Sequence, residues 1–190
     1  VVLEEDTHPT ELFLVFAAEL LAKYRHNHQV AQISGTNHAL GAPSLESDYY
    51  YSRFQHIWGF ATWADRWKGF PEFATSGRLG RSEIKRAFPR MPASFHSHWV
   101  RRVNRELTGE SDTWSASWNM FSALRGRLSV APSESLVANV GFGPAATNAK
   151  RIPLVAGGPP TPAPLNVTFS FRGPDNLVPD GPRDYYVGMT

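Results

Sequence analysis

The chain begins with VVLEEDTHP, Val1 to Pro9, in which three apolar residues run directly into Glu4, Glu5 and Asp6. A short apolar run predicts a buried strand, and the acids would then lie at its C-terminal end, where open α/β sheets bind ligands. Carboxylate oxygens are the ligands that Mg²⁺ and Mn²⁺ prefer. The stretch therefore indicates a divalent-metal site, or more simply a solvated acidic turn. Because the chain starts inside a predicted strand, we expect the domain to be truncated at its N-terminus.

Length and composition are those of one globular domain. The chain has 190 residues, of which 42% are apolar and 13% aromatic, enough for a core and too apolar for general disorder. The net charge is only +2 and the charges are mixed, so we expect no nucleic-acid partner. The lack of cysteine excludes disulfides and thiolate zinc sites. No apolar run reaches the roughly 18 residues of a membrane-spanning helix.

Hydrophobic periodicity predicts an α/β fold. Thr10 is expected to cap a helix over residues 11–25, and a strand over 29–34 would complete a strand–helix–strand unit in a partly parallel sheet. The remaining pattern predicts an extended segment over 46–54, helices over 82–88, 95–107 and 113–124, and short strands over 128–131 and 135–140. Proline and glycine dominate from 152 to 190, so an extended tail is expected after a domain over 1–151.

The block YYYSRFQHIWGFATWADRW, from Tyr49 to Trp67, is rich in aromatic residues. Trp63 and Trp67 are spaced i, i+4, which favours a core helix over 59–70. The alternative is a sugar platform, because an indole face stacks on the C–H surface of a sugar. Gly59, between two aromatic residues, indicates a positive φ or a close backbone approach.

Two further blocks carry polar residues between apolar ones. In SDTWSASWNMF, residues 111–121, Asp112 would be a helix N-cap or an acid near a cleft. In NVGFGPAATNAKR, residues 139–151, the glycines predict an ordinary loop or a lid. His96 and His98 have an H-x-H spacing, but without a third ligand a helix start is the better interpretation.

Taken in order, these blocks resemble the bacterial nucleotide-diphospho-sugar transferases of the GT-A fold, the hemolytic-protein-like or family-2-like glycosyltransferases. The family pattern LEDDCLPSPSFF, ISG, YFSRYPHIWGWATWRRAW, DTWDYQW and NIGFGEDATHT is matched by LEEDTHPTELFL, ISG, YYSRFQHIWGFATWADRW, DTWSASW and NVGFGPAATNA. The resemblance covers Val1 to about Asn148 and corresponds to the C-terminal two-thirds of the family domain. N-acetylglucosaminyltransferase I is distantly similar.

The resemblance implies a fold and a set of roles. The fold would be a GT-A type mixed sheet flanked by helices. Asp6 would bind Mn²⁺ or Mg²⁺, which would hold the donor diphosphate. The other substrate-binding residues implied by the match are Glu4, Glu5, His56, Trp58, Gly59, Trp114 and Asn148.

The catalytic residues depart from the family pattern. Ser115 occupies the position of the family Asp that acts as general base, and a hydroxyl is a poor base without a partner. Asp112 lies nearby and could take over this role, or could only cap the helix. The family His after NIGFG is Asn148 here.

The function implied is a metal-dependent hexosyl- or N-acetylhexosaminyl-transferase. It would move a sugar from a nucleotide-diphosphate donor to a glycan or lipid-linked acceptor, in the cytoplasm or at the inner face of the membrane. The first alternative is an inactive carbohydrate-binding or scaffold protein of the same fold. A metal-dependent diphosphate or phosphodiester hydrolase is less favoured, because two-metal sites need more carboxylates.

Overall fold

The computed structural model describes residues 1–39, 46–141 and 170–189. Its centre is a mixed four-stranded sheet with the order β3-β5-β2-β4. The strands are β2 (Val30–Ser34), β3 (Tyr49–Ser52), β4 (Phe60–Thr62) and β5 (Leu128–Pro132). β2 and β5 are parallel. β4 pairs antiparallel with β2, and β3 pairs antiparallel with β5. The α/β class and the partly parallel sheet predicted from the sequence are therefore confirmed.

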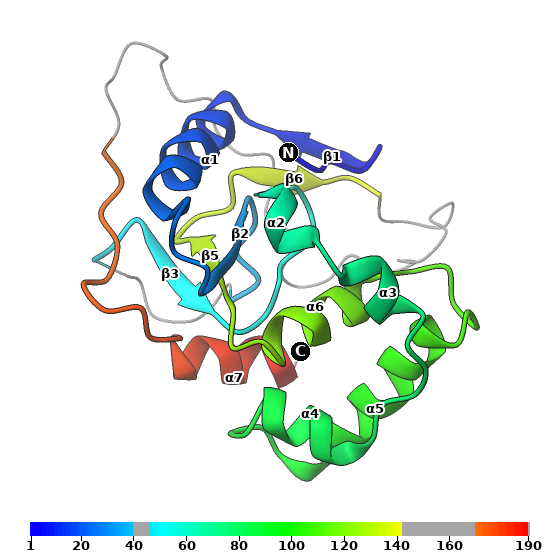
Figure 1. The fold of residues 1–190 in the computed structure, drawn as a ribbon. Coiled ribbons are helices and arrows are strands. Elements are labelled where there is room, and N and C mark those ends of the chain that lie inside the picture. The colour runs from blue at the N-terminus through cyan, green and yellow to red at the C-terminus, as the bar shows by residue number, and fades with distance from the viewer. Residues whose placement is uncertain (40–45, 142–169, 190) are drawn as a thin grey trace.

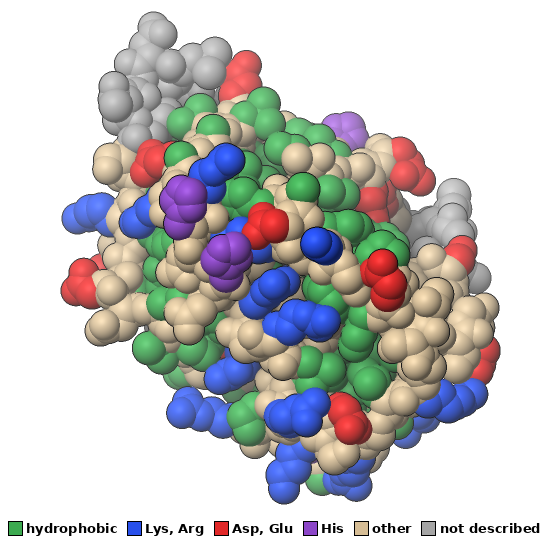
Figure 2. All heavy atoms as spheres, in the orientation of Figure 1, with side chains coloured by type: hydrophobic (Ala, Val, Ile, Leu, Met, Phe, Trp, Pro, Cys, Tyr) green, Lys and Arg blue, Asp and Glu red, His purple; other side chains and the backbone are tan. Residues whose placement is uncertain are grey.

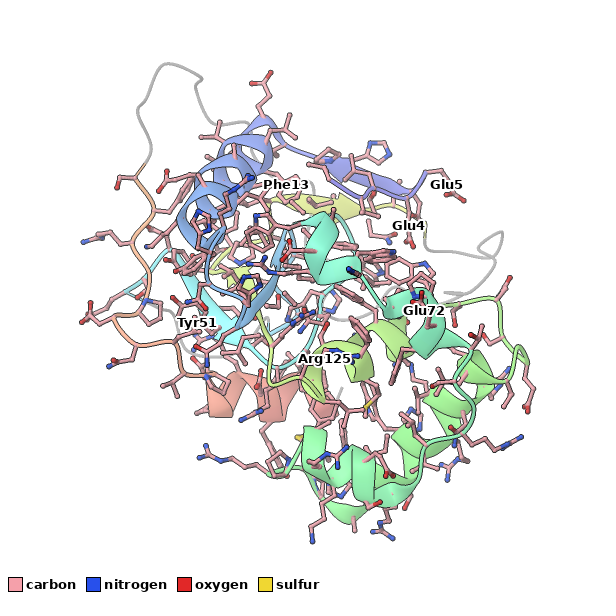
Figure 3. The ribbon with its side chains drawn as sticks, viewed as in Figure 1. Glu4, Glu5, Phe13, Tyr51, Glu72 and Arg125 are labelled. Carbon is pink, nitrogen blue, oxygen red and sulfur yellow. The ribbon has the colours of Figure 1, made fainter. Side chains whose placement is uncertain are left out.

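One face of this sheet is covered by α1 (Glu11–Tyr24) (Figure 1). The helix begins where predicted, because Thr10 Oγ1 accepts a hydrogen bond of 3.2 Å from the N–H of Phe13. Phe13 and the inner residues of α1 pack with the sheet in a single buried cluster, which includes Tyr51 (Figure 3). The hydroxyl of Tyr24 is 2.7 Å from that of Tyr51, so the end of the helix is also held by polar contacts.

The other face carries α6 (Ser115–Ala123) and a group of helices packed on it (Figure 1). Trp118 and Phe121 of α6 pack against Ala31 of the sheet. The group comprises α2 (Ala64–Trp67), α3 (Phe70–Ala74), α4 (Arg81–Ala87) and α5 (Ala93–Leu107). A second buried cluster joins α4, α5 and α6. The helices predicted over 82–88, 95–107 and 113–124 are thus confirmed.

The N-terminal segment differs from its prediction. The strand there is β1 (Thr7–Pro9), and it pairs antiparallel with β6 (Val137–Asn139) in a separate two-stranded sheet. Val1 is 65% exposed, and residues 1–3 contribute only an isolated bridge from Val2 to Phe60. The acids therefore precede a strand instead of following one, and β1, α1 and β2 do not form a strand–helix–strand unit in one sheet.

The aromatic block also differs from the expected core helix over 59–70. Gly59 has φ of 71°, and the chain then forms β4 before the short helix α2. Trp63 is the N-cap of α2 and Trp67 its last residue. Pairing of Phe60 with Ser34 across the sheet decides this outcome, because a pairing between distant strands overrides local helical spacing.

The tail is not wholly extended. Gly181–Met189 form helix α7, which contacts β3. Gly188 of α7 lies so close to Met91 that an added Cβ would be 2.1 Å from the Met91 methyl carbon. The prediction of an extended tail over 152–190 is therefore wrong for residues 181–189, which are helical. In the described parts of the chain, no helix has the length and hydropathy needed to cross a membrane.

Candidate functional site

A groove with a volume of about 570 Å³ opens beside β4 and α2. Three tryptophans form most of its surface, and the lining residues are Val2, Thr62, Trp63, Ala64, Trp67 and Trp114. Each of the three indoles is partly exposed. The groove is thus an apolar, aromatic surface accessible to solvent, which is the surface chemistry that suits the C–H face of a sugar ring.

The groove is built on a rigid base. The ring centroids of Trp67 and Trp114 are 5.9 Å apart, and the Trp67 ring also lies 4.7 Å from that of the buried Trp118. Trp118 Nε1 donates a 2.8 Å hydrogen bond to Gln32 Oε1 in the central strand. The guanidinium of Arg66 lies 4.4 Å from the Trp63 ring centroid. The aromatic wall is therefore anchored to the sheet.

Arg66 is itself buried and closes the end of α1. It is 1% exposed, and its Nη2 donates to the carbonyl oxygens of Tyr24, Arg25 and Asn27. Its Nε donates to the Val30 carbonyl. These four acceptors include carbonyls that the end of a helix leaves unpaired. Arg66 therefore connects α2, and with it the groove, to the loop between α1 and β2.

Glu4, Glu5 and Asp6 form a tight turn in front of β1. The N–H and Oγ1 of Thr7 both donate to the Glu4 carbonyl, at 3.0 and 2.8 Å. Burial raises the pKa of the Glu4 carboxyl, and repulsion from Asp6 and Glu5 raises it further. Figure 3 shows Glu4 and Glu5 at the start of β1. The three carboxylates are thus gathered, and their charges repel one another.

Asp6 is the best placed of the three for a cation. Its Oδ1 is buried without a hydrogen-bond partner, and its backbone carbonyl accepts from the Val140 N–H at 2.9 Å. A Cβ at Gly141 would lie 1.9 Å from Asp6 Oδ2, so only glycine fits there. An orphaned buried carboxylate oxygen fits a metal ligand. However, no group of three or more acidic, His or Cys side chains with metal-binding geometry exists among residues 1–39, 46–141 and 170–189.

Ser115 is the first residue of α6 and directly follows Trp114 of the groove. Its Oγ accepts a 3.4 Å hydrogen bond from Arg102 Nη2. A guanidinium remains protonated and cannot take up a proton, so this contact does not turn the Ser115 hydroxyl into a base. Ser115, the residue expected at a general-base position, is therefore next to the groove, and its contact with Arg102 does not activate it.

Asp112 is exposed and does not cap α6, so its interpretation as an N-cap is wrong. The cap comes instead from Glu106 of α5, whose carboxylate accepts from the N–H groups of Ala116 and Ser117 at 3.1 and 2.7 Å. Glu106 Oε1 also accepts from Thr113 Oγ1 at 2.9 Å. Sequence reasoning missed Glu106, and no local signal could have found it, since it lies in the preceding helix.

His56 and Trp58 do not line the groove. His56 is 2% exposed, and its ring centroid is 4.6 Å from that of His38. The His38 ring is also 4.6 Å from Trp58. Burial, and repulsion from His38, lower the pKa of His56 well below 6.5. Both imidazoles therefore stay neutral at pH 7, and the expectation that His56 lines the cleft is not met at this groove.

His96 is buried, and its Nε2 lies 2.9 Å from the Phe88 carbonyl oxygen, whereas His98 is exposed. The two side chains therefore lie in different environments, and both belong to the first turns of α5. Asn148, the remaining predicted substrate-binding residue, lies outside the described residues.

Three of the motif blocks meet in space although they are far apart in sequence. Val2 and Phe60 exchange backbone hydrogen bonds of 2.7 and 3.1 Å. The Phe60 ring lies 6.0 Å from that of Trp114. A Cβ at Gly59 would be 2.9 Å from Val137, which confirms both the positive φ and the close approach predicted there. The start of the chain, the aromatic block and the DTW segment thus lie together, and Val137 of β6 packs against Gly59 beside them.

Comparisons with protein-family models, with curated proteins and with solved structures found no match to this chain.

Proposed function

We propose that this protein is a metal-dependent glycosyltransferase of GT-A type, in which the tryptophan groove holds a sugar ring. The reaction would move a sugar from a nucleotide-diphosphate donor to a glycan or lipid-linked acceptor. The observation that carries the proposal is that three of the motif blocks line one groove, through Val2 of the N-terminal stretch, Trp63 and Trp67 of the aromatic block, and Trp114 of the DTW segment.

The acidic turn would hold the metal that this chemistry uses. Asp6, with its unpartnered buried oxygen, and Glu4, with its raised pKa, would gain an opposite charge on binding Mn²⁺ or Mg²⁺. Such an ion neutralises charge that develops on the leaving diphosphate. The protein's own contribution is to hold the carboxylates in a turn fixed by Thr7.

One experiment tests the sugar-binding part. Oligosaccharides titrated into the protein should change its tryptophan fluorescence, and Trp63→Ala should weaken this binding about ten-fold or more, as loss of a stacked aromatic ring does. Tyr185 is 50% exposed and does not line the groove, so Tyr185→Ala is the matched control. Equal affinity in wild type and Trp63→Ala would exclude the groove as the sugar site.

A second experiment tests the transferase part. Hydrolysis or transfer of nucleotide-sugar donors should require Mn²⁺ or Mg²⁺ and should be lost in Asp6→Asn but not in Asp175→Asn, an exposed acid far along the chain. Donor turnover that survives Asp6→Asn would remove the metal assignment.

A non-catalytic carbohydrate-binding protein of the same fold is the second candidate. It is favoured by the surroundings of Ser115, whose described partner is the cation of Arg102, and by the use of Glu106 as a helix cap. Sugar binding that depends on Trp63, without donor turnover at any divalent metal, would support it over the transferase.

A further inference from the structure

The charges of the chain are divided between two regions. Residues 76–110, which contain α4 and α5 and are called here the helical lobe, hold eight Lys and Arg against three Asp and Glu, a net charge of +5. All other residues hold eleven against fourteen, a net charge of −3. The overall net charge of +2 is therefore the sum of a strongly basic lobe and a mildly acidic remainder. Figure 2 shows Lys and Arg side chains spread over the lower part of the molecule, where α4 and α5 lie.

The three acids of the lobe are occupied by local contacts. Glu106 is turned inward to cap α6. Glu83 accepts from the Gly80 N–H at 3.0 Å and so caps α4. Glu110 pairs with Arg78 at 3.2 Å. None of the ion pairs found among the described residues involves the other lobe cations, which are Arg81, Lys85, Arg86, Arg90, Arg101, Arg102 and Arg105.

Most of these cations lie on the outer side of the two helices. On α5, Arg101 and Arg105 are exposed and four residues apart, whereas Trp99 and Val103 on the opposite side are buried. On α4, Arg81 and Lys85 have the same i, i+4 spacing and are exposed, whereas Ile84 is buried. Both helices contact α6 with their inner sides, so their outer sides present cations away from the body of the protein.

We propose that the outer side of the helical lobe binds the surface of a membrane containing anionic lipids. Cations spread over two helices can all be satisfied by a flat, laterally mobile layer of negative headgroups, and each Lys or Arg near such a surface contributes to binding. The attachment is peripheral and electrostatic, since none of the large apolar side chains exposed in the described residues belongs to the lobe.

A single-stranded nucleic acid fits this surface less well. Such ligands stack their bases on exposed aromatic rings, and Phe88, Phe95 and Trp99 of the lobe are all buried. The proposal does not depend on the proposed enzymatic function. If both hold, the lobe would bring the groove close to the membrane, because Arg102 of the lobe contacts Ser115 beside Trp114.

The test is co-sedimentation of the protein with vesicles of phosphatidylcholine and phosphatidylglycerol, compared with vesicles of phosphatidylcholine alone. Binding is expected only to the anionic vesicles, and it should weaken as salt is raised, since charges are screened beyond about 10 Å at 0.1 M salt. The triple variant Lys85→Gln, Arg101→Gln, Arg105→Gln should lower the partition coefficient about 100-fold, from about five-fold for each lost cation.

The matched control neutralises three exposed cations outside the lobe, Arg25→Gln, Lys68→Gln and Arg172→Gln. It changes the net charge by the same amount and should alter vesicle binding about two-fold at most, since its cations lie away from the proposed contact. Equal losses in the two triple variants would overturn the proposal, because net charge alone would then explain binding. Equal binding to neutral vesicles would also overturn it, as would tighter binding of a single-stranded RNA through the same three lobe residues.

Discussion

Glu106 on α5 accepts a 2.7 Å hydrogen bond from the backbone N–H of Ser117 in the first turn of α6. A buried carboxylate at a helix N-terminus satisfies N–H groups that the helix itself leaves unpaired, and its charge complements the helix dipole. Trp114 and Ser115 stand at this same helix start. The pair of α5 and α6 therefore determines where one wall of the groove lies.

Glu106→Gln should lower the free energy of unfolding by about 2 kcal/mol, because the amide keeps one acceptor but loses the charge and presents an N–H₂ donor to a backbone N–H. Denaturant unfolding followed by circular dichroism measures it. Glu110→Gln is the control, since Glu110 is exposed, and should cost about 0.5 kcal/mol or less. Equal effects of the two substitutions would show that the cap is not important.

Gly59→Ala should destabilise the protein more than Gly109→Ala. Both glycines have a positive φ, 71° and 73°, so the backbone cost of about 1 kcal/mol is shared. A Cβ at Gly59 would also lie 2.9 Å from Val137, whereas nothing lies within 4 Å of one at Gly109. We expect the difference in unfolding free energy to be about 1–2 kcal/mol, and similar midpoints would contradict the close approach.

Asp184 should make the protein less stable as pH rises. Burial raises the pKa of its carboxyl to about 6, although hydrogen bonds from Ser52 and the Arg53 N–H oppose this. The folded state therefore holds the proton more tightly than the unfolded state, so stability is lost between about pH 4 and pH 6. The loss is on the order of 3 kcal/mol. Comparing wild type with Asp184→Asn across this range isolates the effect, and parallel stability curves would refute it.

His38 should act in the opposite sense. Burial lowers the pKa of its imidazole to about 4 from the usual 6.5, so the unfolded state binds the proton more tightly. The stability that His38 contributes is present above pH 6.5 and is lost as pH falls towards 4. His38→Gln should therefore flatten the acid side of the stability profile. His98→Gln is the control, since His98 is exposed, and should leave that profile unchanged.

Ser115→Asp tests the proposed catalytic position. If the protein transfers sugars, restoring a carboxylate there should raise the transfer rate at least ten-fold, part of the 10²–10⁴-fold that a positioned base contributes. Donor affinity should stay nearly constant. Ser111→Asp, in the same segment, should leave the rate unchanged. A rate that does not respond to Ser115→Asp would favour the carbohydrate-binding candidate.

Helices were the elements best predicted from sequence. The segments that form α1, α4, α5 and α6 carry apolar residues at helical spacing, and Thr10 caps α1. The apolar spacing and the cap residue lie within, or next to, the helices that they predict. The α/β class followed from the same patterns.

The predictions that failed depended on distant partners. The apolar start was assigned to a buried strand, but Val2 makes only a bridge to Phe60, and pairing with β6 selects Thr7–Pro9 instead. Trp63 and Trp67 have helical spacing, but β4 ends just before Trp63 because β4 pairs with β2. The candidate site shows the same dependence, since Trp63 and Trp67 were expected in a core helix and line the groove instead, whereas Trp114 was predicted as a substrate-binding residue.

The sequence by itself determined where α1, α4, α5 and α6 form and that the fold is α/β, because each depends on side chains a few residues apart. Only the tertiary structure decided that Glu106 and not Asp112 caps α6, that Arg66 closes α1, and that three tryptophans from two blocks share a groove. These contacts join residues far apart in the chain, and their energy appears only once packing has brought donor and acceptor, or ring and ring, to within contact distance.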